Sequence, residues 1–140
     1  MKCLAAQRLF ALFVAVGIVL SMASASASAK PVDFRAMMQA DTNETIKRLK
    51  LTPAQEPTVK AILDGAIAQR MAVLEAYQIK PGVPPPAPIA TLIQVQGRMD
   101  DIRTAIHTAL TPVLKPDQLA LADRLSEEYR GKYRRILLNP

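Results

Sequence analysis

The sequence has no tryptophan, and tyrosine and phenylalanine occur only three times each among its 140 residues. Single-stranded nucleic acids are bound by basic grooves in which aromatic side chains stack on the bases, so this scarcity disfavours such a role. The basic residues are also interleaved with acidic ones until residues 130–135. We therefore expect no nucleic-acid partner.

The residue types that carry most metal and nucleophile chemistry are also scarce. His107 is the only histidine. A ligand pair on one helix face would need a carboxylate three or four residues away, but Arg103, Thr104, Leu110 and Thr111 occupy those positions. The sequence contains no Gly-rich phosphate loop, and any Ser-His-Asp set would depend on His107. We therefore expect no metal site, no cofactor and no catalytic residues.

An apolar run long enough to span a bilayer is missing as well. The run Leu9–Leu20 has 12 residues, fewer than the roughly 20 that a transmembrane helix needs. It follows Lys2 and Arg8 and precedes alternating Ser and Ala, which is the three-part pattern of a signal peptide. We predict that the first 29 residues are a signal peptide cleaved after Ala29, with Ala27 as the second choice. The alternative is an uncleaved anchor that uses the Ser/Ala tail to reach membrane length.

Cleavage would change the chemistry of the chain. Cys3 lies before the apolar run, whereas a lipidated cysteine would follow it, and its removal leaves no thiol and no disulfide. Stability must then come from packing. Loss of Lys2 and Arg8 from the 18 basic residues leaves 16 against 12 acidic ones, a net charge of +4. Residues 30–140 are enough for one domain, and no stable membrane insertion is expected after cleavage.

The pattern of the mature chain predicts an all-α domain. Apolar residues recur at spacings of three and four, while Pro and Thr fall between segments of helix length. The first helix is expected over about Thr42–Leu49, with Asp41 or Thr42 as its N-cap. An extra turn upstream would carry Phe34, Met37 and Met38.

The segment Leu51-Thr52-Pro53-Ala54-Gln55 has the chemistry of a helix start. The Thr52 side chain can cap the helix, and Pro53 can take the first helical position, where its missing N–H costs nothing. The Gln55 side chain can reach back to the Thr52 amide. The sequence therefore predicts a capping box and a helix over Pro53–Ile79, whose apolar positions form one wide stripe.

The proline-rich residues 80–88 cannot be helical. We interpret them as a semi-rigid turn between helices, although a proline-rich recognition motif has a similar composition. The third helix is expected over about Ile89–Leu114, with a kink or an early end near Leu110 because Thr111-Pro112 follows. Leu114-Lys115-Pro116-Asp117-Gln118 then repeats the start pattern, with Lys115 at the position of the capping threonine, and the last helix follows.

Two Leu-x-Pro-x-Gln helix starts, separated by long amphipathic helices behind a signal peptide, resemble the LTxxQ-motif family of Spy/CpxP-like periplasmic stress proteins. The resemblance covers roughly residues 42–138. It implies an extended helical hairpin of about four helices, forming a curved homodimer in the periplasm. It also implies that the motif residues start helices and fix turns, and that none is catalytic; these residues are Leu51, Thr52, Pro53, Gln55, Leu114, Pro116 and Gln118.

The resemblance implies an ATP-independent chaperone or envelope-stress protein whose partners are unfolded or misfolded envelope proteins. Flexible methionine side chains suit promiscuous binding surfaces. The candidate client-binding residues are Met37, Met38, Met71 and Met99, for each of which a place in the core or in the dimer interface is the alternative. The alternative function is a metal-responsive protein or a regulator that binds the periplasmic domain of a sensor kinase.

Overall fold

The computed structural model describes residues 32–84 and 88–138. Within these ranges the chain forms four helices and no strand. They are α1 (Phe34–Leu49), α2 (Glu56–Ala76), α3 (Ile89–Leu110) and α4 (Pro116–Leu138). The all-α prediction with four helices is confirmed, whereas the predicted signal peptide, its cleavage sites and Cys3 lie outside the described residues.

Helix α1 begins eight residues before its expected start at Thr42. Its N-cap is Asp33, whose Oδ1 accepts a hydrogen bond from the Ala36 amide at 2.9 Å, so the prediction of Asp41 or Thr42 as the N-cap was wrong. The expected extra turn at Phe34 is the first turn of the same helix. The early start is stabilised by tertiary packing, since Phe34 is buried and its ring meets that of Tyr133 edge-on at 5.2 Å.

Helix α2 begins at Glu56, three residues after the expected start at Pro53, although the predicted capping box forms in the turn that leads into it. The Gln55 amide donates to Thr52 Oγ1 at 3.3 Å, and the Thr52 amide donates to Gln55 Oε1 at 3.0 Å. The first turn of backbone hydrogen bonds follows at once, because the Glu56 amide donates to the Thr52 carbonyl at 3.1 Å.

The C-terminal end of α2 lies at Ala76, three residues before the expected end at Ile79. Gln78 adopts φ 54°, and the Ile79 amide donates back to the Leu74 carbonyl at 2.8 Å, which is a Schellman termination. Ile79 and Leu74 are both buried, so the termination also closes the core at this end.

Helix α3 ends at Leu110, as the Thr111-Pro112 pair predicted. The Leu114 amide donates to the Leu110 carbonyl at 2.9 Å, and α4 begins two residues later at Pro116. The described part of the proline-rich segment is not helical, as expected. Gly82 adopts φ 79°, and the Cβ atom of any other residue at this position would lie 3.0 Å from Val32 Cγ2. The chain therefore turns tightly here against the residues that precede α1.

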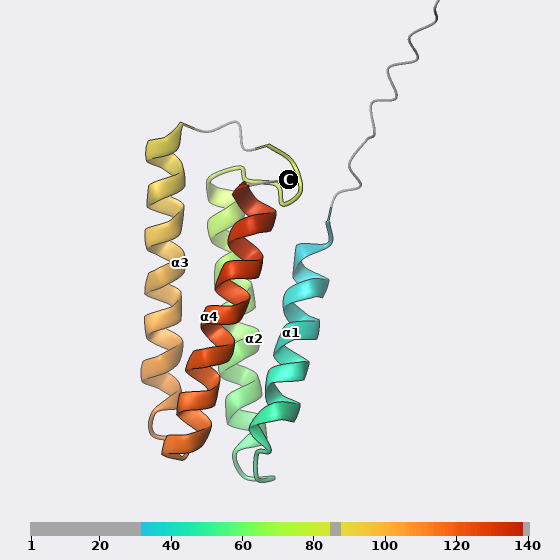
Figure 1. Cartoon of the computed structure of the whole chain (residues 1–140), viewed down its shortest axis with the longest axis vertical. Coiled ribbons are helices and arrows are strands. Elements are labelled where there is room, and N and C mark those ends of the chain that lie inside the picture. The colour runs from blue at the N-terminus through green and yellow to red at the C-terminus, as the bar shows by residue number, and fades with distance from the viewer. Residues whose placement is uncertain (1–31, 85–87, 139–140) are drawn as a thin grey trace, which may run out of the picture.

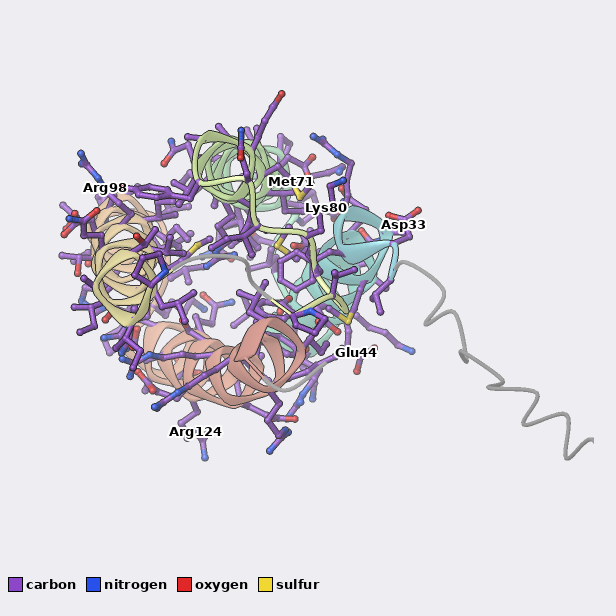
Figure 2. The ribbon with its side chains drawn as sticks, turned by 90° about the horizontal axis from the view of Figure 1, so that it is seen from above. Asp33, Glu44, Met71, Lys80, Arg98 and Arg124 are labelled. Carbon is purple, nitrogen blue, oxygen red and sulfur yellow. The ribbon has the colours of Figure 1, made fainter. Side chains whose placement is uncertain are left out.

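The four helices alternate in direction and stand at the corners of a square (Figures 1 and 2). Helices α1 and α2 form one helical hairpin and α3 and α4 another; the two hairpins meet where α2 packs against α3 and where α4 packs against α1. From the α3–α4 turn upward, α4 leans away from α3 towards α1 (Figure 1). The expected homodimer stays a prediction.

The core consists of two clusters stacked along the bundle. The cluster at the motif end contains Leu49, Val59, Leu110, Leu114 and Ala122. The cluster at the other end contains Phe34, Met38, Ile67, Leu74, Ile79 and Val95. None of the described helices combines the length and the apolar character that a membrane span requires.

Candidate functional site

The two motif copies meet at one end of the bundle, where the α1–α2 and α3–α4 turns lie together (Figure 1). Gln55 Nε2 donates to Gln118 Oε1 at 3.0 Å, and Gln118 Nε2 donates to Gln55 Oε1 at 3.4 Å. The side-chain amides of the two motifs therefore bond to each other reciprocally, across 63 residues of sequence.

Each amide of this glutamine pair also ties down backbone of both turns. Gln55 Nε2 donates to the Val113 carbonyl at 2.8 Å, and Gln118 Nε2 donates to the Leu49 carbonyl at 3.1 Å. Gln118 Oε1 accepts from the Lys115 amide at 3.0 Å, which reproduces half of the capping box although the capping threonine is missing. The donors and acceptors of both amides are thus used.

The remaining motif residues form the apolar and helix-starting parts of the turns. Leu114 belongs to the motif-end core cluster, and Leu51 packs against it. Pro53 is exposed within the first turn after Thr52, and Pro116 is the first residue of α4. The architectural role that the resemblance implies for these residues stays a prediction.

A cavity of about 380 Å³ opens where α4 leans away from α3. Its wall is mostly apolar and includes Phe34, Leu63 and Leu125, so side chains of the other three helices face α3 across it. On its rim, Ile89 and Ile93 are exposed by 77% and 65%, the largest exposures among the described large hydrophobic residues. We call this feature the α3–α4 groove.

The polar side chains of the α3–α4 groove are unequally paired. Asp41 accepts from Lys132 Nζ at 2.8 Å and from the Tyr133 hydroxyl at 2.8 Å. Burial, together with the hydrogen bond to Asp41, raises the pKa of Tyr133 above its usual range. Arg70 also lines the groove, and burial lowers the pKa of its guanidinium.

Two further arginines of the groove have carboxylate partners. Arg130 pairs with Asp100 at 3.2 Å, and both Arg130 and Arg103 pair with Glu127. Arg103 Nε is buried and has no hydrogen-bond acceptor within the described part of the chain. By contrast, no described carboxylate forms an ion pair with Arg70.

The methionines predicted to form a client-binding surface lie in or against the core. Met38 is 1% exposed, and Met37, Met71 and Met99 are partly buried against the same cluster. Figure 2 shows Met71 between α2 and α1. Of these four methionines only Met99 lines the α3–α4 groove. Met38 offers no surface to a client, because its side chain is buried.

His107 has a carboxylate neighbour that its own helix does not supply. Its Nδ1 lies 2.8 Å from Asp123 Oδ1 of α4, and both side chains are about half exposed. In the ranges 32–84 and 88–138, no group of three or more His, Cys, Asp or Glu side chains is arranged so that it could hold a metal ion. Sequence spacing could not reveal this pair, because it forms across two helices.

Comparisons with protein-family models, with curated protein sequences and with solved structures found no significant match for this chain.

Proposed function

We propose that this protein is an exported, ATP-independent chaperone that binds unfolded segments of other envelope proteins in the α3–α4 groove. The observation that carries the proposal is the groove itself, an apolar cavity of about 380 Å³ continuous with the exposed Ile89 and Ile93. Apolar surface left open at a concave site is typical of a binding site for apolar partners.

Two further features support this proposal. The predicted signal peptide would deliver the protein to a compartment without ATP, where a helper must act by binding alone. The helix starts that resemble the LTxxQ motif are joined by the glutamine pair, which holds the two hairpins together at the end opposite the exposed isoleucines. One end of the bundle is thereby fixed, while α3 and α4 diverge towards the other.

The test is suppression of aggregation by residues 30–140 added in excess to a chemically unfolded client, followed by light scattering. The variant Ile89→Ser/Ile93→Ser removes apolar surface from the rim without disturbing buried residues. It should suppress aggregation several-fold less well than the wild type, because binding of this kind scales with apolar area.

The matched control is Ala61→Ser/Ala68→Ser, which places the same two hydroxyls on exposed positions of α2. This control should suppress aggregation as the wild type does. No suppression by the wild type, or equal loss in both variants, would refute the proposal.

A further inference from the structure

Of the two partly buried arginines of the α3–α4 groove, Arg70 and Arg103, only Arg70 has no carboxylate partner among the described residues. It is partly buried on α2, it lines the groove, and neither a hydrogen bond nor an ion pair joins it to any acceptor in the described residues. The Asp41 carboxylate, which also lines the groove, is already bound by Lys132 and Tyr133. A desolvated cation without a partner costs free energy, which an anion placed beside it would recover.

The lining of the groove as a whole has more positive than negative side chains. Four arginines line it, against two aspartates, Asp41 and Asp100. Arg130 and Arg103 are held by carboxylates, whereas Arg134, exposed on the rim, has no ion pair among the described residues. Charge complementarity therefore favours an anionic ligand over a neutral or cationic one.

The remaining lining would hold a hydrocarbon chain. It runs along α3 from Ile89 to Leu110, about 30 Å at the 1.5 Å rise of a helix, and its side chains are mostly aliphatic or aromatic. The volume of about 380 Å³ is within the range of small-molecule sites, which is about 300–1,000 Å³. The site thus combines a long apolar wall with one desolvated guanidinium.

We propose that the α3–α4 groove binds a fatty acid, with its carboxylate on Arg70 and its hydrocarbon chain along the apolar wall. A carboxylate fits better than a larger head group, because the fork of one guanidinium takes one carboxylate bidentately, and Arg103 and Arg130 of the groove are already paired with carboxylates. This binding does not depend on client binding, since the ligand is a small molecule held inside the bundle.

The experiment is calorimetric titration of residues 30–140 with dodecanoate below its micellar concentration, with dodecan-1-ol and dodecylamine as neutral and cationic ligands of equal chain length. Saturable binding of one dodecanoate per chain is expected, at least about tenfold tighter than either other ligand, because a charge-assisted hydrogen bond is lost with them. Equal binding of dodecanoate and dodecan-1-ol would overturn the proposal.

The variant Arg70→Met should weaken dodecanoate binding at least about tenfold and leave dodecan-1-ol binding unchanged. The matched control is Arg124→Met, since Arg124 points away from the bundle on α4 (Figure 2) and does not line the groove. Circular dichroism checks that Arg70→Met and Arg124→Met are folded. Arg70→Lys keeps the charge but not the two-pronged guanidinium, so its affinity for dodecanoate should lie between those of the wild type and Arg70→Met.

Unchanged affinity in Arg70→Met would refute the role of that residue. A lysophospholipid of equal chain length that binds more tightly than dodecanoate would refute the assignment of a carboxylate. Dodecanoate binding without suppression of client aggregation would support this inference and refute the proposed function. Suppression of client aggregation without dodecanoate binding would support the proposed function and refute this inference.

Discussion

Replacing Gln118 by alanine removes the most enclosed part of the glutamine pair. Gln118 is 8% exposed, and its amide holds the Leu49 carbonyl, the Lys115 amide and the side chain of Gln55. Leu49 is 2% exposed, so its carbonyl would lose a donor where water has little access. That loss costs about 1–3 kcal/mol, and the other two interactions add about 1 kcal/mol each.

We therefore expect Gln118→Ala to lower the free energy of unfolding by about 3–5 kcal/mol. Gln55→Ala should cost less, about 2 kcal/mol, because Gln55 is only partly buried and the exposed Thr52 amide can bond to water instead. The two effects should not add, since each variant already breaks the shared bonds.

The assay is urea unfolding of residues 30–140, followed by circular dichroism because the chain has no tryptophan. Gln118→Glu keeps the shape of the side chain but cannot donate to the Leu49 carbonyl, so at pH 7 it should be at least as destabilising as Gln118→Ala. The control Gln94→Ala, at an exposed position of α3, should stay within about 0.5 kcal/mol of the wild type. A loss below about 1 kcal/mol for Gln118→Ala, or a larger loss for Gln55→Ala, would refute the reasoning.

Three further predictions concern other parts of the bundle. Met38→Ala should lower the free energy of unfolding by about 2–5 kcal/mol, and Met37→Ala clearly less, because only Met38 is fully buried; equal losses in urea unfolding would contradict this. The raised pKa of Tyr133 means that the folded state keeps a proton that the unfolded chain releases above about pH 10. Stability should therefore fall as the pH rises past about 10, and Tyr133→Phe should reduce that slope in unfolding curves recorded at a series of pH values. His107→Ala should change the free energy of unfolding by less than about 1 kcal/mol, because its contact with Asp123 is solvent-exposed. A larger loss of stability on thermal or urea unfolding would contradict this prediction.

Local sequence chemistry was enough to predict the capping box of the first motif and the end of α3, but not the first residue of α2. The Thr52–Gln55 capping box and the end of α3 before Pro112 depend on neighbouring residues alone. Spacings of three and four were sufficient for the all-α class, since the period of an apolar stripe reflects the helix itself.

Features that depend on distant residues could not be predicted from the sequence. The start of α1 was missed because Phe34 packs on Tyr133, and the end of α2 was overestimated because the Schellman turn closes on a buried Ile79. The place of Met38 in the core follows equally from packing among helices.

The sequence by itself determined that a helix follows each of the two motifs, because proline and side-chain capping act over a few residues, although α2 begins three residues after Pro53. Only the tertiary structure decided that Gln55 and Gln118 bond to each other, since this requires two turns 63 residues apart to meet. It also decided that Arg70 lines a cavity and has no carboxylate partner among the described residues. Helix α4 leans towards α1, and its Lys132 and Tyr133 bind the Asp41 carboxylate of that helix.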